Sequence, residues 1–426
     1  MSRGRRRDPS RPLRLAVLCP HFEPDIAPTG AVISRIVHEL VSLGHEVHVV
    51  TALPWYRSHA IEPGWTGRRI RRETTPWGSI TRVHPFPGND KANLLRRAIG
   101  FAGFSALAAW TGVRGGRVDG VLSMSPPLTN GVIGWLMSLV RRGPLVFNIQ
   151  DIFPDAAIET GAIDPGTVVG RVIVTLASWL ERFSYRRSAA VTVLSGDLRD
   201  NVVAKLPARF ADRVRVIPNF VLTEDIRPKD RLTVYRTELG IGSEPVVLYA
   251  GNVGFSQSLD LVLAAAREMP EVTFVINGDG SAKAALIEQA GVLANVRFGT
   301  YQPMERLAEV LATGDVHVVP LRAGLGRVSV PSKTYSILAA GRPVVAAIDP
   351  GTEVPRMLEA SGAGVAVPPD DPDAFVTALR SMVADPVQAA AMGARGRQWV
   401  ESAASPRAVA LAYESLFREL LGRRQG

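Results

Sequence analysis

Short apolar runs rich in valine and isoleucine recur along the chain, and longer segments with helical periodicity separate them. Most of these runs lack polar residues at alternate positions, which is typical of strands that are covered on both faces of a sheet. Strands that alternate with helices in this way predict a parallel, doubly wound α/β sheet. The predicted strands are residues 13–19, 46–51, 80–84, 118–123, 144–149, 189–194 and 214–217 in the first half and 246–251, 272–277, 295–298, 315–319, 343–347 and 364–367 in the second.

One strand in each half leads into a glycine and then into a helix. In the second half the segment 251–254 (Gly-Asn-Val-Gly) ends a strand, and periodicity predicts a helix from about 258 to 268. In the first half the strand at 13–19 is followed by a loop that holds Gly30 and by a helix over 31–43. Glycines allow close approach of the backbone, and the free N–H groups and dipole of a helix N-terminus favour phosphate. Two such units predict two Rossmann-like domains that face each other across a cleft.

A chain of 426 residues is too long for one ordinary core, so two domains are expected. Proline and a run of charged residues place the domain boundary near 218–228. We expect a disordered basic tail over 1–12, a first domain over 13–222 and a second domain over 223–405. The last segment, 406–424, is predicted to be an amphipathic helix that packs back on the first domain.

The composition is that of a globular protein, with 46% hydrophobic and 21% charged residues. The single cysteine, Cys19, excludes an internal disulfide and fits a reducing cytosol. No stretch reaches the roughly 18 uncharged apolar residues of a membrane-spanning helix. The nearest is residues 98–113, which is uncharged and flanked by arginines. It is either a helix at a membrane surface or a buried helix that covers the first sheet.

Positive charge is concentrated in the first half of the chain. Residues 1–217 hold 29 Lys and Arg against 17 Asp and Glu, a net of +12, whereas residues 218–426 hold 20 against 23, a net of −3. Arginine patches attract anionic lipid head groups, nucleic acid or phosphorylated substrates. The alternative is that arginine serves solubility alone. Nucleic acid is disfavoured as a partner, because no aromatic stacking motif or groove-reading element accompanies the basic residues.

The segment Pro331-Ser332-Lys333 opens a predicted helix after the strand at 315–319 and its loop. Ser332 is a favourable N-cap residue. Lys333 is unexpected in a first turn, because a cation there opposes the helix dipole by about 0.3–1 kcal/mol. A bound diphosphate reverses that effect, so we interpret Lys333 as a phosphate ligand. The alternative is a lysine that bends into water or pairs with a neighbour.

Two further candidates follow predicted strands, where ligands bind in open α/β sheets. Asp151 comes directly after the residues 144–150. It is either a carboxylate that orients an acceptor hydroxyl or an ordinary turn aspartate. The segment 278–280 (Gly-Asp-Gly) is either a ligand contact or a plain turn.

Several kinds of chemistry find no support in the sequence. His21 is interpreted as a loop residue rather than a base, and no serine–histidine–acid pattern stands out. Clusters with metal-ligand spacing and a phosphate loop ending in Gly-Lys-Ser/Thr are absent. Gly30 lies too far from its strand for the dinucleotide-binding spacing, which argues against a nicotinamide or flavin enzyme.

Taken in order and spacing, these segments resemble family-4 retaining glycosyltransferases with the GT-B fold. The similarity is to the branch that adds amino sugars in bacterial surface-polysaccharide synthesis, and it covers about residues 13–421. The matching segments are the loop up to Gly30 with the helix ending in Leu43-Gly44-His45-Glu46-Val47, then Asp151-Ile152-Phe153-Pro154-Asp155, Tyr249-Ala250-Gly251-Asn252-Val253-Gly254, Asn277-Gly278-Asp279-Gly280, Pro331-Ser332-Lys333 and Ala339-Ala340-Gly341-Arg342-Pro343-Val344-Val345.

The resemblance implies that the second domain holds a nucleotide-sugar donor, weakly favouring uridine over guanosine, and that the first domain binds the acceptor. It also implies retention of configuration at the sugar carbon. Such enzymes usually need no metal or other cofactor, because backbone N–H groups and basic side chains neutralise the leaving diphosphate. The implied site residues are Asp151 and Lys333 for catalysis; Gly251, Asn252, Gly254, Gly278, Asp279, Gly280, Arg327, Ser332, Lys333 and Glu353 for the donor; and Thr29 and Gly30 in the loop of the first domain.

The chain departs from the family pattern at several of these positions. Many members carry a histidine where this chain has Gln150, and an arginine and a lysine within the segment 255–257, which is Phe-Ser-Gln here. Two glutamates are usual where this chain has Val328 and Ser336. The second glutamate normally touches the donor sugar, so its loss bears on donor identity and on activity.

Other residues could compensate for these departures. Lys333 and Arg327 are candidates for the missing positive charge, and Glu353 is a candidate for an acidic contact with the sugar.

Two alternatives keep the fold and change the function. A sugar-nucleotide 2-epimerase needs paired acid and base carboxylates, of which only Asp151, and less favourably Asp155, is available. A binding protein that has lost catalysis would also fit the missing glutamates.

The preferred hypothesis is a glycosyltransferase that acts on a lipid-linked or other cell-envelope glycan acceptor. We expect it in the cytoplasm, at the inner face of the plasma membrane. The basic first half and the stretch 98–113 motivate contact with an anionic membrane surface.

Overall fold

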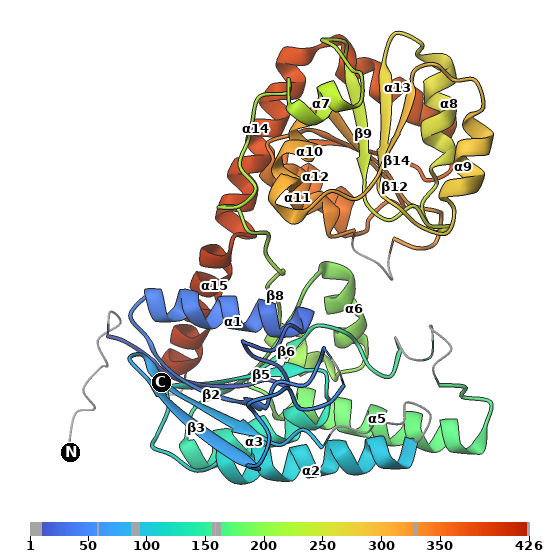
Figure 1. The fold of residues 1–426 in the computed structure, drawn as a ribbon. Helices are drawn as coiled ribbons and strands as arrows, with labels where there is room; N and C mark the ends of the chain where they lie inside the picture. Colours follow the sequence, from blue (N-terminus) through green and yellow to red (C-terminus); the bar gives the residue numbers. More distant parts are fainter. Residues whose placement is uncertain are drawn as a thin grey trace. The chain divides into compact units, whose positions relative to one another are not determined.

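A computed structural model describes residues 11–57, 59–86, 94–155, 158, 163–326 and 331–423. The chain forms two compact units. The first comprises Met1–Asn219 and Val409–Gly426, and the second comprises Phe220–Ala408. Each unit is an α/β sheet with helices packed against it (Figure 1).

The sheet of the first unit has eight strands in the order β3-β4-β2-β1-β5-β6-β7-β8. The chain order reverses between β1 and β5, which makes this pair the topological switch point of the sheet. The strands are β1 (Arg14–Leu18), β2 (Glu46–Ala52), β3 (Ile70–Thr75), β4 (Gly78–Val83), β5 (Gly120–Ser125), β6 (Leu145–Ile149), β7 (Ala190–Val193) and β8 (Val214–Val216).

The edge strand β3 was not predicted, and it makes the sheet mixed rather than wholly parallel. It pairs antiparallel with β4 through a tight connection, and its residues are half-buried or exposed. The sequence Ile-Arg-Arg-Glu-Thr-Thr contains no apolar run, because an edge strand outside the covered part of the sheet does not need one. A pattern built on buried runs therefore misses it.

Helices cover both sides of the first sheet. Helices α2 (Leu94–Gly112), α3 (Thr129–Arg141) and α5 (Val168–Arg187) lie side by side on one side, and α1 (Pro28–Ser42) lies on the other (Figure 1). Phe104 and Ala108 of α2 are buried in the core against the sheet. The described part of α2 is therefore a covering helix, which was one of the two interpretations of residues 98–113. The remaining elements are α6 (Gly196–Ala204), the 3-10 helix η1 (Ala208–Arg213) and α15 (Pro406–Arg423).

The second unit has a wholly parallel six-stranded sheet in the order β11-β10-β9-β12-β13-β14, the strand order of a dinucleotide-binding domain. Its strands are β9 (Val246–Ala250), β10 (Thr273–Asn277), β11 (Val296–Gly299), β12 (Val316–Pro320), β13 (Val344–Ala347) and β14 (Gly364–Val367). Its helices are α7 (Val234–Glu238), α8 (Asp260–Glu268), α9 (Lys283–Ala290), η2 (Met304–Arg306), α10 (Leu307–Thr313), α11 (Lys333–Ala339), α12 (Glu353–Ser361), α13 (Pro372–Ala384) and α14 (Pro386–Ala403).

The last helix, α15, belongs from Val409 onward to the first unit. Tyr413 and Phe417 on this helix are buried. The Tyr413 hydroxyl accepts a hydrogen bond from Asn148 Nδ2 at 2.9 Å and lies 3.3 Å from Thr192 Oγ1. These partners stand on the neighbouring strands β6 and β7, so one phenol joins helix α15 to two strands of the first sheet.

We predict that Tyr413→Phe lowers the free energy of unfolding by about 1–3 kcal/mol, because it leaves the buried Asn148 amide without one acceptor. Tyr301→Phe is the matched control, since Tyr301 is 58% exposed. Its effect should stay within about 0.5 kcal/mol. Equal effects of the two substitutions in chemical denaturation would contradict the proposed fastening.

Candidate functional site

In the second unit the chain order reverses between β9 and β12, and ligands of such sheets bind beyond the carboxyl ends of the strands at this point. The segments found there are 251–254 after β9, 278–280 after β10, 321–326 after β12 and 348–352 after β13. Helix α11 and helix α12 follow two of these segments. The sequence predicted most of its donor-site residues on these same segments.

The two glycine turns after β9 and β10 are joined by backbone hydrogen bonds. Val253 N donates to Asp279 O at 2.9 Å, and Ala282 N donates to Val253 O at 3.0 Å. Gly251 and Gly278 both have a φ of +146°, a conformation that side chains disfavour. A side chain on Gly278 would also overlap the carbonyl group of Gly251. Glycine at 278 therefore permits the two turns to lie in direct contact.

Lys333 is the first residue of α11, and its side chain reaches back to the end of β9. Its Nζ donates a hydrogen bond to the Tyr249 hydroxyl at 2.7 Å and lies 4.0 Å from the centre of the Tyr249 ring. A Cβ atom on Gly251 would lie 2.9 Å from the same Nζ. Burial lowers the pKa of Lys333 to about 8. Among the described residues no carboxylate pairs with this ammonium group.

Tyr249 connects this lysine to the glycine turn. Its hydroxyl accepts from Lys333 and donates to the carbonyl of Asn252. Burial raises the pKa of Tyr249, so the phenol keeps its proton. Tyr249 was not predicted to belong to the site. The signal for it was available, because an aromatic residue with a polar end stood just before the glycine turn at the end of a buried strand.

Two expectations about helix starts need correction. Ser332 stands at the N-cap position of α11, but its φ of −57° and ψ of −24° are helical, and its side chain makes no capping hydrogen bond. A capping side chain needs an extended backbone at this position. Helix α8 starts only at Asp260, and its first turn carries that carboxylate. Asp370 Oδ1 also accepts from Ser258 Oγ at 2.5 Å. The start of α8 thus lies beside two carboxylates, Asp260 and Asp370, which both lie within 4.0 Å of Arg322.

The other predicted donor residues lie around the same strand ends. Gly254 N donates to Gln257 Oε1 at 3.0 Å. Asp279 is exposed, and its carboxylate accepts from Gly280 N at 2.8 Å. Ser336 is half-buried on α11. The predictions for Arg327 and Val328 fall outside the described residues.

Glu353 begins α12 and is 16% exposed, with its carboxylate 3.6 Å from Arg356 Nη1. It contributes, after burial, to the raised pKa of Tyr335 on α11. The preceding loop is fixed by Asp349, whose two carboxylate oxygens accept from Gly324 N and Gly326 N, each at 2.9 Å. Glu353 thus stands close to the helix that carries Lys333.

In the first unit the corresponding strand ends carry a histidine–aspartate pair that sequence reasoning did not identify. His21 Nδ1 lies 2.7 Å from Asp25 Oδ2, and Asp25 Oδ1 accepts from Tyr56 N at 3.1 Å. The imidazole stacks on Trp55 at 5.7 Å and meets the edge of Tyr56 at 5.3 Å. Asp25 is buried, so the orientation of the imidazole is fixed. In the neutral ring with Nδ1 protonated, Nε2 is left as an acceptor.

Gly30 lies in the first turn of α1 rather than in a loop, and it is next to His21 of the histidine–aspartate pair. A Cβ atom on Gly30 would lie 2.9 Å from His21 Cβ, so glycine makes room for the histidine. Thr29 is half-buried beside it. The helix starts earlier than predicted because Pro28 is well suited to a first helical position.

Asp151 follows β6 and is exposed, whereas its neighbour Gln150 is buried. Gln150 Nε2 donates to Asn148 Oδ1 at 2.7 Å, and Gln150 Oε1 accepts from Asn219 Nδ2 at 3.0 Å. The amide at the position where histidine is usual is therefore held in an internal polar network. That network continues through Asn148 to Tyr413.

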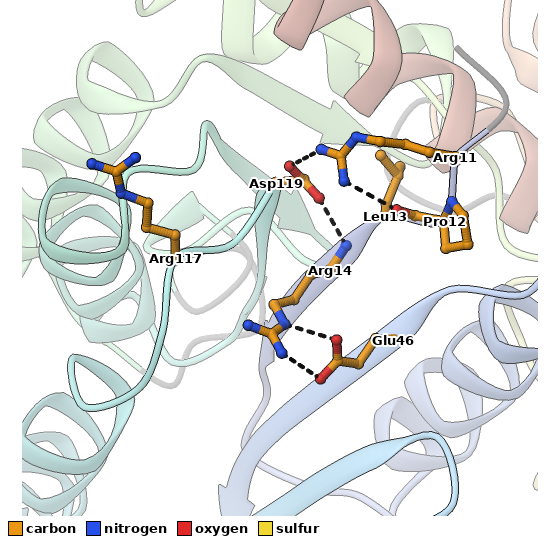
Figure 2. A pocket seen from close by; sticks show the side chains of 7 residues that line it. All are labelled: Arg11, Pro12, Leu13, Arg14, Glu46, Arg117 and Asp119. Atoms are coloured by element: carbon orange, nitrogen blue, oxygen red, sulfur yellow. Dashed lines mark hydrogen bonds and ion pairs between the residues drawn. The ribbon is translucent and has the colours of Figure 1, made fainter. Parts of the chain in front are cut away.

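A pocket of about 420 Å³ lies at the opposite edge of the first sheet, at the amino ends of β1, β2 and β5 (Figure 2). Arg14 forms a two-pronged ion pair with Glu46, at 2.7 and 3.0 Å, and Arg11 pairs with Asp119 at 2.5 Å. Arg117 points away from these pairs (Figure 2). Two of the three arginines that line the pocket are therefore paired with acids, and the pocket lies away from the strand ends that carry the candidate residues.

Neither a metal-binding cluster nor a membrane-spanning helix is found in the described part of the chain. No group of three or more His, Cys, Asp or Glu side chains is placed to hold a metal ion. No helix within the described ranges is long and apolar enough to cross a membrane.

Comparison with known proteins identifies the class to which this arrangement belongs. The family described as "Glycosyl transferase 4-like domain" matches residues 29–219, and "Glycosyl transferases group 1" matches residues 244–385. The chain therefore belongs to the family-4 glycosyltransferases with the GT-B fold.

Individual relatives agree with this classification. The chain is 27% identical over 380 residues to WcaI of Escherichia coli K12, a candidate colanic acid biosynthesis glycosyl transferase, with 86% of this chain and 91% of WcaI covered. Among solved structures it is similar to sucrose-phosphate synthase from Thermosynechococcus elongatus, with a TM-score of 0.66, 19% identity, and 96% and 100% of the two chains covered. It is also similar to Anabaena HepE in complex with UDP-glucose, with a TM-score of 0.60, 15% identity, and 96% and 100% covered.

The burial of Lys333 leads to a prediction about stability and pH. Its pKa is about 8 in the folded protein against an ordinary value of 10.5, so the folded state binds fewer protons between these pH values. Below pH 8 the lysine is charged in both the folded and the unfolded state, and the cost of partly burying that charge lowers the free energy of unfolding by its full amount. As the pH rises from 8 toward 10.5, the folded protein loses this charge first, and the cost disappears. Lys333→Met should raise the free energy of unfolding by about 1–3 kcal/mol at pH 7, with the gain vanishing near pH 10.5.

Lys283→Met is the matched control for this measurement. Lys283 Nζ donates to the carbonyls of Gly278 and Gly299, each at 2.8 Å. Its removal should lower stability by about 1–3 kcal/mol, the opposite sign. A Lys333→Met protein that is less stable than the parent at pH 7 would show that Lys333 is a structural residue.

Proposed function

We propose that this protein is a retaining glycosyltransferase that moves a sugar from a nucleoside-diphosphate sugar, uridine-linked, to a lipid-linked or other cell-envelope glycan. The observation that carries the proposal is the ammonium group of Lys333 at the ends of β9 and β12. It is half-buried, it is held by a neutral phenol, and no described carboxylate compensates its charge. A diphosphate would supply that compensation.

The chemistry of the donor follows from the groups around this lysine. The diphosphate would lie against Lys333 and the backbone of Gly251 and Asn252, where the absence of a side chain on Gly251 allows close approach. In the transfer, the bond between the sugar carbon and the diphosphate oxygen breaks, and a bond to an acceptor oxygen forms. The electron pair stays on the diphosphate, which can take the proton of the acceptor hydroxyl. Lys333 would stabilise this developing charge without a metal ion.

Two similar proteins support a nucleotide-sugar donor and a role in surface-polysaccharide synthesis. HepE is similar in fold and was solved with UDP-glucose, and WcaI is named for colanic acid biosynthesis. The base and ribose would lie near Gly278 and Gly280, whose turn is joined to the turn of Gly251. Glu353 would supply a carboxylate to the donor sugar in place of the glutamate that Ser336 replaces.

The first unit would bind the acceptor. The imidazole of His21 offers Nε2 to a hydroxyl group, and its neighbours Trp55 and Tyr56 present aromatic rings to an apolar sugar face. Asp151, exposed at the end of β6, is a second acceptor contact. These groups follow β1, β2 and β6 of one sheet, in which β1 and β2 are adjacent and β5 separates β1 from β6. The switch point lies between β1 and β5.

Lys333→Ala should weaken the binding of UDP by at least about tenfold, because one charge-assisted contact to the diphosphate is lost. Isothermal titration calorimetry with UDP measures this effect. Lys229→Ala, which removes an exposed lysine of the same unit, is the control and should leave the affinity unchanged. A parent protein that binds no UDP at millimolar concentration, or a Lys333→Ala protein of unchanged affinity, would overturn the donor assignment.

A product assay distinguishes the three functions. The protein is incubated with UDP-sugars, with and without a total lipid extract of the source cells. A glycosyltransferase releases UDP and labels the lipid fraction, an epimerase accumulates a sugar-nucleotide isomer without the extract, and an inactive binding protein does neither. Only the first outcome supports the proposal.

His21→Ala should lower the rate of transfer to the lipid fraction about 10–100-fold and leave UDP binding unchanged, because it removes a group that positions the acceptor. Asp25→Asn should have a similar but smaller effect, since it changes the group that orients the imidazole. His38→Ala is the control, because His38 is exposed and pairs with Glu23. Full transfer activity in His21→Ala would exclude this pair from acceptor binding.

A further inference from the structure

The solvent-facing side of α5 is apolar along most of its length. Its exposed side chains stand at intervals of one, three and four residues, which places them on one side of a helix. Each is more than half exposed: Val168 69%, Val169 64%, Val172 54%, Leu176 59% and Trp179 61%. The opposite side of the helix packs on the protein through Gly170, Ala177, Ser184 and Tyr185. A helix that is apolar on its outer side needs an apolar environment there.

This apolar side carries positive charge and almost no negative charge. The sequences of the three adjacent helices α2, α3 and α5 together contain one acidic residue, Glu181. Glu181 is buried and accepts hydrogen bonds from Lys205 and Tyr185, each at 2.9 Å, so it adds no surface charge. Exposed arginines follow the apolar side of α5, namely Arg171, Arg182, Arg186 and Arg187.

Aromatic side chains connect α5 to α3. Phe183 meets Trp135 edge-on at 5.2 Å and stacks on Trp179 at 5.6 Å. The guanidinium of Arg187 lies 5.2 Å from the Trp135 ring. Leu139 and Val140 of α3 are 57% and 59% exposed. The helices lie side by side on one side of the sheet (Figure 1). We call this set of exposed residues on α3 and α5 the α5 face.

We propose that the α5 face lies on the surface of an anionic lipid bilayer. Aliphatic side chains would enter the boundary between head groups and acyl chains, and Trp179 would lie at the head-group level. The arginines would reach the lipid phosphates with their apolar stems against the same boundary. The combination of large aliphatic residues, tryptophan and arginine, on helices whose only acidic residue is buried, complements an anionic bilayer in both apolarity and charge.

This inference goes beyond the proposed transfer reaction and does not depend on it. It also places the membrane contact on a segment other than 98–113, which the sequence left open between a helix at a membrane surface and a buried helix. The stretch 98–113 was the sequence-based candidate, but Phe104 and Ala108 of α2 face the core. The exposed apolar side chains stand instead on α5, which the sequence did not single out because its apolar residues alternate with arginines and small residues.

Vesicle sedimentation tests the proposal without any substrate. The full chain should pellet with vesicles of phosphatidylcholine and 30% phosphatidylglycerol at low salt, and less at high salt or without phosphatidylglycerol. Replacing Val172 and Leu176 by glutamate should lower the bound-to-free ratio about tenfold or more, because two apolar contacts become repelled charges. The matched control replaces Val292 and Val387, which are 99% and 80% exposed in the second unit, by glutamate.

A second measurement identifies the contact directly. Lipids brominated in the acyl chains should quench the tryptophan fluorescence of the parent protein, and Trp179→Phe should lose most of that quenching. Circular dichroism verifies that each variant is folded. The proposal is wrong if the parent does not pellet, or if the glutamate variant pellets as the parent does. It is also wrong if light scattering shows that the parent is a dimer and the variant a monomer, because the α5 face is then a contact between two copies.

Discussion

The candidate donor site depends on one interaction, the hydrogen bond from the ammonium of Lys333 to the hydroxyl of Tyr249. The Tyr249 hydroxyl in turn donates a hydrogen bond to the carbonyl of Asn252. These two hydrogen bonds hold helix α11 in a fixed position relative to the glycine turn after β9. A neutral partner positions the lysine without neutralising it. Had a carboxylate occupied the place of Tyr249, the same geometry would be more stable and would have no charge left for a ligand.

The glycine turns give this lysine its surroundings. A side chain at 278 would overlap the carbonyl group of Gly251, so glycine there lets the turns after β9 and β10 form backbone hydrogen bonds. A side chain at 251 would instead crowd Lys333 Nζ. Because Gly251 has no side chain, its backbone is accessible to a group that lies against Lys333. Stability and ligand contact are thus served by the same residues in this unit. In the first unit, Gly30 acts differently, since it makes room for His21 within the protein.

The sequence predicted the parts of the fold that follow from burial. Every predicted strand is present, because strands covered on both faces must be apolar and are recognised by that property. The strand β3 was not predicted, because it is an edge strand whose middle residues, Arg71 to Glu73, are charged. Gly251, Gly278 and Lys333 were predicted together and are found at neighbouring strand ends. Tyr249 was missed although its place just before the glycine turn was a signal for it. The pair of His21 and Asp25 was missed because their contacts with Trp55 and Tyr56 join segments that no spacing along the chain reveals.

The hairpin of β3 and β4 also bears on how the protein behaves in solution. A parallel sheet ends in a row of unpaired backbone groups, and such a row is an open template for other chains. Here that row belongs to a strand with Arg71, Arg72 and Glu73 in its middle, and the opposite edge is the three-residue strand β8. Both margins of the eight-stranded sheet therefore discourage strand addition. The charged residues of the edge strand β3 thus have two effects. They disfavour self-association by extension of this sheet, and they are the reason why the apolar pattern did not predict this strand.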